Sequence, residues 1–244
     1  DKFLPEEELM PLAQAISRVF ARLGEKKNRA RARIKFLVTQ LGVDKFKQLV
    51  LEERASLQDD PRWTDHLEEA ASQSETPLRD PKPLSTNDIE AAGESFREWM
   101  QTNVYHQRQT HYTVATVALP LGDLTAQQMR SLAGIARRYV GNTVRTTVEQ
   151  NIVLRWVRES DLPALHREFD AIGLARPGAE SIADITACPG TDTCKLGIAS
   201  SRGLAAELER RLADQLGTMD ESVRRLRLKV SGCFNSCGQH HVAD

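Results

Sequence analysis

The chain has 244 residues, of which 40% are hydrophobic and 27% are charged, an ordinary composition for one large globular domain or two small ones. The formal net charge is −1, so the total charge does not indicate a nucleic acid or an acidic membrane as partner. No apolar run has the length of a transmembrane helix, no signal peptide is visible, and four cysteines are too few for a secreted disulfide framework. We therefore expect a cytoplasmic protein. Because the chain begins with Asp1 and ends in a glycine-rich, loop-like stretch, we expect it to be a piece of a longer polypeptide.

The first hundred residues are predicted to be largely helical. Apolar side chains recur there at the spacing of amphipathic helices. The helices are expected at 10–23, 28–41, 44–54 and 87–100. Asp44 is a suitable N-cap, and Gly24 and Gly42 are suitable helix stops. Between the third and fourth helices the chain is first acidic and then rich in Pro, Ser and Thr, which is typical of a linker.

After residue 110 the pattern changes to β-branched segments that alternate with helical ones. The expected elements are a strand at 111–119, a helix at 124–139, strands at 142–148 and 151–157, and a helix at 160–172. Thr125 and Gln128 are placed as a capping box, and Gly173 stops the last helix. This β-α-β-β-α order resembles a ferredoxin-like plait or part of one. The predicted fold class is α+β.

The four cysteines lie in the last fifth of the chain, in one Cys-x5-Cys pair and one Cys-x3-Cys pair. They are Cys188, Cys194, Cys233 and Cys237. A helix at 196–216 and a strand in the segment LRLKV are expected between the pairs. The x5 gap is wide for a tetrahedral zinc site, whereas a 4Fe-4S cluster takes its four thiolates from a wider cage. Four buried, inert cysteines are the alternative, which we favour less because the thiols occupy glycine-rich loops.

The surroundings of these cysteines also suit an anionic cofactor. Glycines allow backbone N–H groups to approach sulfur, and they stand at Gly190, Gly197, Gly232 and Gly238. A helix that begins near Cys194 would direct the positive end of its dipole toward the cofactor.

Three segments of the chain resemble siroheme-dependent sulfite and nitrite reductases. ACPGTDTC, followed by SGCFNSCGQHHVAD, resembles the cluster signature of that family, and VRTTVEQNIVLRWV is similar to the motif of its ferredoxin-like half-domains. KNRARARIKFLVTQLGVDKFK resembles the helices that precede the second half-domain. The resemblance implies four parts: the helical end of a first siroheme/cluster-type domain at 1–55, an acidic linker and helix at 56–104, a ferredoxin-like half-domain at 105–175, and a truncated 4Fe-4S/siroheme domain at 176–244.

The same resemblance implies roles for individual residues. All four cysteines would ligate the cluster, and Cys237 would also bridge to the siroheme iron. Asn235 matches a position that contacts siroheme, although a turn-forming role is the alternative. Siroheme carries many carboxylates, and Arg29 and Arg33, four apart on one expected helix face, match basic positions near it; a solvated charged face is the alternative. Arg145 begins the half-domain motif and is either a cofactor contact or a structural residue.

The implied activity is the six-electron reduction of sulfite to sulfide or of nitrite to ammonia, at a siroheme coupled to a 4Fe-4S cluster. Ferredoxin or a flavoprotein would supply the electrons. Two other classes stay open, namely a cluster-binding electron-transfer module without siroheme and a zinc-stabilised structural domain. No catalytic residue is assigned, because the basic substrate-binding groups of the family are expected outside this chain, and we expect no turnover from the chain alone.

Overall fold

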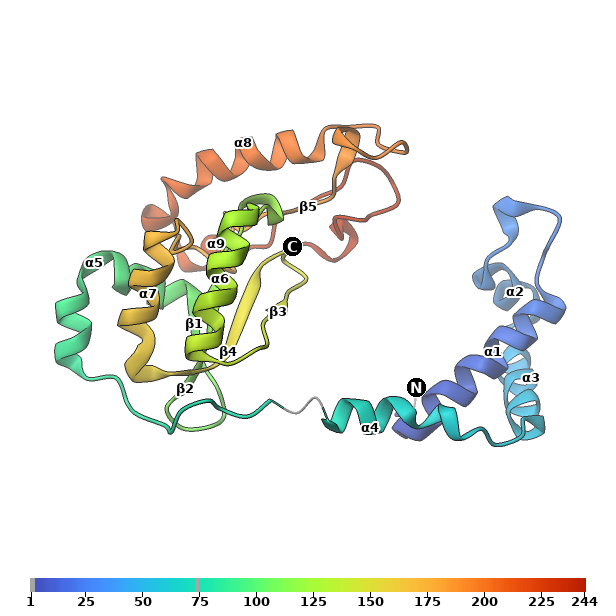
Figure 1. Ribbon diagram of the computed structural model, residues 1–244. Helices are drawn as coiled ribbons and strands as arrows, with labels where there is room; N and C mark the ends of the chain where they lie inside the picture. Colours follow the sequence, from blue (N-terminus) through green and yellow to red (C-terminus); the bar gives the residue numbers. More distant parts are fainter. Residues whose placement is uncertain (1–2, 73–74) are drawn as a thin grey trace. The chain divides into compact units, whose positions relative to one another are not determined.

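The computed structural model describes residues 3–72 and 75–244, and the chain divides into two compact units, Asp1–Glu75 and Thr76–Asp244 (Figure 1). The first unit is helical. Its core forms where α1 and α3 pack together and bury Ala15, Val19 and Val50, with Trp63 against them. Its elements are the 3-10 turn Glu6–Glu8, α1 (Leu9–Leu23), the 3-10 turn Arg29–Arg31, α2 (Ile34–Leu41), α3 (Val43–Ser56), the 3-10 turn Pro61–Trp63 and α4 (Asp65–Ser72).

The helix expected at 28–41 is shorter than predicted, since α2 begins only at Ile34. The Glu25 carboxylate accepts the backbone N–H groups of Lys27 and Asn28, and Asn28 in turn caps a separate 3-10 turn. These side-chain acceptors stabilise a loop in competition with the helix. The N-cap prediction for α3 is also wrong, because Gly42 is its N-cap and Asp44 lies in its first turn.

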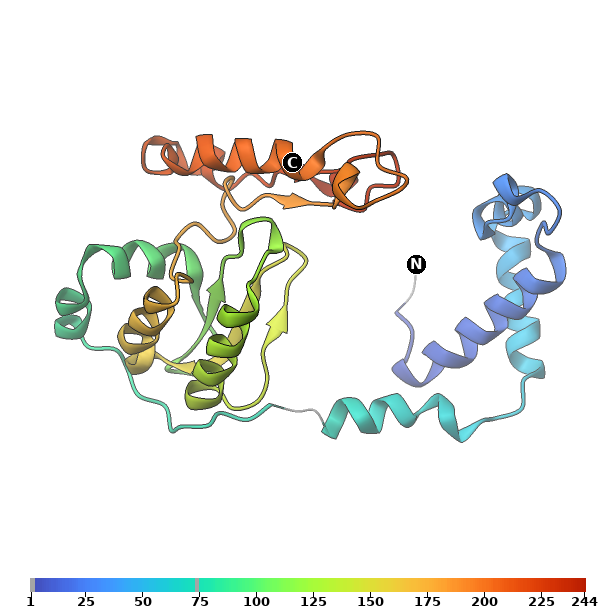
Figure 2. The ribbon, with the colours of Figure 1, turned by 45° about the horizontal axis from the view of Figure 1, so that its top comes forward.

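The second unit contains a four-stranded antiparallel sheet in the order β1-β2-β4-β3. Helices α6 and α7 lie side by side against this sheet, and α5 packs on α7 (Figures 1 and 2). The core between them contains Phe96, Trp99, Leu154, Leu165 and Phe169, all fully buried. The elements are α5 (Thr86–Asn103), kinked at Gly93, β1 (Val104–His106), β2 (Tyr112–Val117), α6 (Ala126–Tyr139), β3 (Arg145–Thr146), β4 (Ile152–Arg158) and α7 (Leu162–Ala171).

The α+β, ferredoxin-like prediction is confirmed, with one addition. The edge strand next to β2 is β1, which precedes the predicted β-α-β-β-α series and has only three residues. The capping box of Thr125 and Gln128 is present at the start of α6. Gly173 follows α7 with a φ of 70°, the left-handed conformation that glycine adopts most easily.

The remainder of the second unit carries the cysteines. β5 (Thr186–Ala187) and β6 (Lys229–Val230) form a two-stranded parallel sheet, and α8 (Ser201–Ala213) packs on it through Ala205; α9 (Glu221–Arg224) precedes β6. The helix predicted at 196–216 is therefore shorter at both ends, and only two residues of LRLKV pair as a strand. Among the helices of the described ranges 3–72 and 75–244, none has the length and apolarity needed to cross a membrane.

Candidate functional site

The two cysteine loops adjoin because each follows one strand of the parallel β5–β6 pair. The N–H of Cys188 donates to the Val230 carbonyl at 3.1 Å, which continues the strand pairing into the first loop. Two further bonds join the loops, since the N–H groups of Ile198 and Ala199 donate to the Gly232 carbonyl at 2.8 and 3.1 Å. Parallel strands end at the same edge of a sheet, so segments far apart in sequence meet there.

Glycines make this close approach of the two loops possible. A Cβ on Gly232 would lie 2.7 Å from the Ala199 carbonyl oxygen and 2.8 Å from Gly190 Cα. A Cβ on Gly197 would lie 2.7 Å from the Gly190 carbonyl carbon, and one on Gly238 only 2.1 Å from the Val230 carbonyl oxygen. The glycine pattern seen in the sequence therefore serves mainly the contact of backbone against backbone.

Cys188 has the most enclosed thiol of the four, and polar groups surround it. The Gly232 N–H donates to Cys188 Sγ at 3.1 Å, and Ser201 Oγ lies 3.3 Å from the same sulfur and 2.7 Å from the Cys188 carbonyl oxygen, two acceptors within reach of its one hydroxyl proton. Burial raises the pKa of the Cys188 thiol, but hydrogen bonds from Ser201, Gly232 and Gly190 outweigh it and lower the pKa overall. A lowered pKa favours the thiolate, which is the form that binds metals.

The other three thiols are more accessible. Cys194 and Cys237 are exposed, Cys233 is half-buried, and all four cysteines are free of disulfides. The expected helix near Cys194 is absent from that position, because the first helical residue is Ser201. The N–H groups of Ile198 and Ala199, which a helix would use internally, bond to Gly232 instead. The dipole argument for Cys194 is therefore wrong.

The chemistry of the donor set, four free thiols on two adjoining loops, fits a 4Fe-4S cluster. Within the described part of the chain, no three Cys, His, Asp or Glu side chains converge into a group that would hold a single metal ion. The four thiols instead come from two loops joined by backbone hydrogen bonds, and one of these thiols already accepts an N–H group. Thiolate ligands with N–H···S hydrogen bonds are characteristic of iron–sulfur sites.

The residues expected near siroheme have different settings. Arg29 lies in a 3-10 turn and Arg33 is the extended residue before α2, so the expectation that they share one helix face is wrong. Both are exposed and belong to the unit Asp1–Glu75. Arg145 starts the short edge strand β3, and Asn235 is exposed in the turn between Cys233 and Cys237.

Two residues in the turn between β3 and β4 hold the cysteine segment and were not predicted from the sequence. The Gln150 side-chain amide bonds to the N–H and the carbonyl of Ala187, the residue before Cys188. Asn151, almost fully buried, accepts the Leu119 N–H and donates to Asp184. The feature that marks this turn is the left-handed backbone of a non-glycine residue, with a φ of 68° at Gln150. A sequence does not show this conformation, so it gave no signal for either residue.

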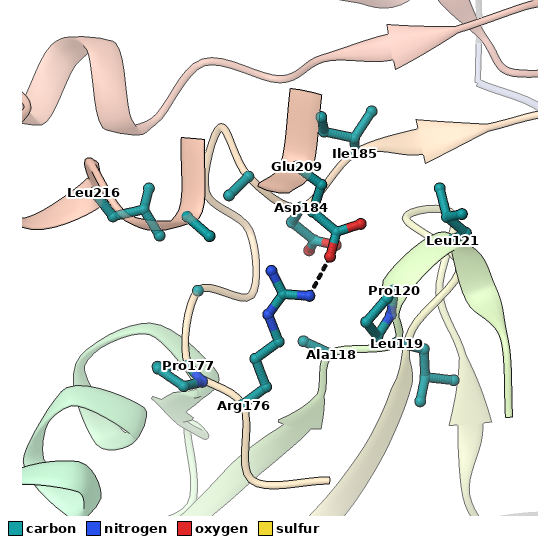
Figure 3. Close-up of a pocket in the computed structure, with 13 residues that line it drawn as sticks. Ala118, Leu119, Pro120, Leu121, Arg176, Pro177, Asp184, Ile185, Glu209 and Leu216 are labelled. Carbon is teal, nitrogen blue, oxygen red and sulfur yellow. Dashed lines mark hydrogen bonds and ion pairs between the residues drawn. The ribbon is translucent and has the colours of Figure 1, made fainter. Parts of the chain in front are cut away.

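A small cavity of about 150 Å³ lies between the half-domain and the cysteine segment (Figure 3). Arg176 extends along it and forms an ion pair with the carboxylate of Glu209 on α8. Burial raises the pKa of Asp184, whose side chain also lines this space, although hydrogen bonds from Glu180 and Asn151 act in the opposite direction. The Asn151–Asp184 hydrogen bond connects the half-domain to the cysteine segment, and the Arg176–Glu209 ion pair holds α8 to the start of that segment.

Fold and site together define a protein that combines a ferredoxin-like half-domain with a paired-cysteine segment. Two family models match the chain and together cover more than half of it. The nitrite and sulphite reductase 4Fe-4S domain matches residues 1–58, and the nitrite/sulfite reductase ferredoxin-like half domain matches residues 105–172. The chain belongs to the siroheme-dependent sulfite and nitrite reductase family, whose cofactors are a 4Fe-4S cluster and siroheme.

Similar proteins carry names from both branches of this family. The chain is 28% identical to the chloroplastic ferredoxin–nitrite reductase of Spinacia oleracea, covering 100% of this chain and 36% of that protein. It is 26% identical to the ferredoxin–nitrite reductase of Synechococcus elongatus (98% and 40%) and 28% identical to sulfite reductase (ferredoxin) 2 of Mycolicibacterium paratuberculosis (99% and 39%). The solved structure of the Mycobacterium tuberculosis NirA protein superposes with a TM-score of 0.63 at 26% identity, over 97% of this chain and 38% of that one. The chain thus spans 36% to 40% of the length of these relatives.

Proposed function

We propose that this chain forms the cluster-holding part of an oxidoreductase that reduces sulfite to sulfide or nitrite to ammonia by six electrons. The observation that carries the proposal is the joining of the two cysteine loops at one end of the β5–β6 pair, next to a half-domain that matches the reductase family. The relatives named above include both a nitrite and a sulfite reductase, so both substrates are proposed.

Four thiolates would hold the 4Fe-4S cluster, namely those of Cys188, Cys194, Cys233 and Cys237. Cys237 would in addition bridge to the siroheme iron. Siroheme, when bound, supplies the iron at which the anion is reduced, and the cluster supplies electrons to it one at a time. The residues of this chain hold the thiolate ligands, donate N–H groups to sulfur and keep the two loops in register.

The remaining residues that we propose as siroheme contacts have basic or amide side chains, which suit an anionic macrocycle. Arg29, Arg33 and Arg145 would pair with siroheme carboxylates, and Asn235 would contact the macrocycle from the loop between two cluster ligands. We also propose the division at 1–55, 56–104, 105–175 and 176–244 as the domain organisation.

Electrons are proposed to come from ferredoxin rather than a flavoprotein, because the similar nitrite and sulfite reductases are named for ferredoxin. Nitrite reduction consumes six electrons and eight protons and yields ammonium and two waters. We further propose a cytoplasmic location and no nucleic-acid or membrane partner, in line with the near-neutral charge of the chain.

Anaerobic visible spectroscopy with iron, acid-labile sulfide and zinc analysis tests the proposal, on the parent protein and on this chain after cluster reconstitution. We expect siroheme bands in the parent, and about four irons and four sulfides per chain, the content of one such cluster. Cys237→Ser is expected to remove the siroheme bands. Cluster absorbance without siroheme would favour the electron-transfer module, and zinc with a featureless spectrum would favour the structural domain.

A further inference from the structure

The side-chain amide of Gln150 closes the free edge of the strand that leads into Cys188. Gln150 Nε2 donates to the Ala187 carbonyl at 3.0 Å, and Gln150 Oε1 accepts the Ala187 N–H at 3.1 Å. These are the two hydrogen bonds that a neighbouring strand would make. On its other edge, β5 bonds to the β6 segment through the N–H groups of Thr186 and Cys188. The backbone that precedes the first cysteine is therefore held on both edges.

Gln150 is itself fixed by the half-domain. Its φ of 68° is left-handed, a conformation that is unfavourable for a non-glycine residue. Its N–H donates to the Thr147 carbonyl at 3.1 Å, which closes the turn between β3 and β4. A Cβ on Gly122 would lie 3.1 Å from Gln150 Cβ, so the backbone of the neighbouring segment packs closely against this side chain. Gln150 therefore has an unfavourable backbone conformation, and both polar atoms of its side-chain amide bond to Ala187. This combination indicates that the residue positions the Ala187 backbone.

The next residue, Asn151, adds a second link from the same turn to the cysteine segment. Asn151 Oδ1 accepts the Leu119 N–H at 2.8 Å, and Asn151 Nδ2 donates to Asp184 Oδ2 at 2.7 Å. The same Asp184 oxygen accepts the Glu180 N–H at 2.8 Å. Both ends of the segment that approaches Cys188 are thus joined to one turn of the half-domain.

We propose that Gln150 is a positioning residue for Cys188: its amide clamps Ala187 and so sets where the first thiol stands relative to the loop of Cys233 and Cys237. The clamp transmits the rigidity of the half-domain core to the cluster site. Its significance for ligation rests on the proposed function, in which Cys188 binds the cluster.

Amide hydrogen exchange at Ala187, measured on the whole chain without cofactor, tests the clamp directly. Gln150→Leu should accelerate that exchange about tenfold, since both hydrogen bonds are lost and 1.4 kcal/mol corresponds to a factor of ten. Gln150→Glu should have a smaller effect, because the carboxylate still accepts the Ala187 N–H but no longer donates to its carbonyl. Gln107→Leu is the matched control: Gln107 Oε1 also accepts a backbone N–H, that of Trp156 at 2.6 Å, but its side-chain amide donates to Gln109 in the half-domain and not to the backbone beside a cysteine.

The effect on the cluster is read from its reduced EPR spectrum and from the rate of iron release to a chelator, after anaerobic reconstitution. We expect Gln150→Leu to change the g values and to release iron about tenfold faster, and Gln107→Leu to leave both unchanged. Equal behaviour of the two variants in exchange and in EPR would overturn the proposal. If the wild-type chain takes up no iron, the proposed function fails, while the exchange at Ala187 still decides whether the clamp exists.

Discussion

The N–H of Gly232 donates a hydrogen bond to Cys188 Sγ at 3.1 Å, although the two residues stand 44 positions apart in the chain. The bond exists because β5 and β6 run parallel and place the two cysteine loops at one edge. Gly232 is thus the hydrogen-bond donor to the Cys188 sulfur and, at the same time, a point where two backbones touch. Substitutions at this residue should affect both functions.

Gly232→Ala should separate the two loops, since the new Cβ would meet the Ala199 carbonyl oxygen at 2.7 Å and Gly190 Cα at 2.8 Å. Backbone atoms at such distances must shift, so we expect the N–H···S bond to break and cluster iron to fall to less than half of the wild-type content. Iron analysis after reconstitution measures this. Gly134→Ala is the control: it lies within α6, where the Cβ meets only Arg138 Nη1 at 3.7 Å, and it should stabilise the fold by roughly 0.5–1 kcal/mol. Wild-type iron content in Gly232→Ala would contradict the prediction.

The accessibility of the thiols predicts an order of chemical labelling. Without cluster, Cys194 and Cys237 should react first with iodoacetamide, Cys233 more slowly and the buried Cys188 last, despite its lowered pKa. With the cluster bound, all four should be protected, because a ligated thiolate is no longer free to react. Peptide mass spectrometry at several times gives the order. Continued rapid labelling of Cys194 or Cys237 in the iron-loaded protein would remove that residue from the ligand set.

The ion pair between Arg176, where the cysteine segment begins, and Glu209 on α8 should contribute to the stability of that segment. Glu209 is buried while Arg176 is partly exposed, so Arg176→Met should cost about 2 kcal/mol, less than a fully buried pair. The double variant Arg176→Met with Glu209→Leu should be less destabilised than Arg176→Met alone, since no carboxylate is then buried without a partner. Urea denaturation of the three proteins provides the comparison. A double variant that is the least stable of the set would mean that packing, and not charge, dominates here.

The buried ring of His166 predicts a loss of stability in acid. Its Nε2 has no hydrogen-bond partner among the described residues, and its ring packs on Phe96 and Trp99 with centroids 5.5 and 5.2 Å away. Burial lowers the pKa of His166 in the folded protein. As the pH falls through the ordinary histidine value of about 6.5, the unfolded chain binds a proton at this residue and the folded chain does not, so the free energy of unfolding decreases.

His166→Phe keeps an aromatic ring in this core and removes the titrating group. The melting temperature of this variant should therefore fall less than that of the wild type between pH 7.5 and 5.5, values chosen to bracket that titration. His106→Phe is a suitable comparison, because the His106 side chain is largely exposed, so its ring loses little solvation on folding. An unchanged pH slope in His166→Phe would show that other groups cause the acid sensitivity.

Much of the half-domain could be predicted from local patterns. The capping box at Thr125, the stop at Gly173 and the β-branched runs of the strands depend on residues close together in sequence, so they can be predicted without the fold. The three-residue strand β1 was missed because its pairing partner, not its own sequence, makes it a strand. The helix expected over 28–41 failed because the Glu25 and Asn28 side chains compete for backbone N–H groups.

For the site, the sequence by itself determined which residue types are present: four cysteines in two pairs, with glycines around them. Only the tertiary structure decided how they are arranged. It placed Gly232 against Cys188, began α8 at Ser201 instead of near Cys194, and directed the amide of Gln150 onto Ala187. The Gly232–Cys188 and Gln150–Ala187 contacts join residues 44 and 37 positions apart, and in each of them one partner is a backbone group, which any residue type supplies. Such bonds leave little trace in composition or spacing, and they form only when the parallel strands bring the loops together.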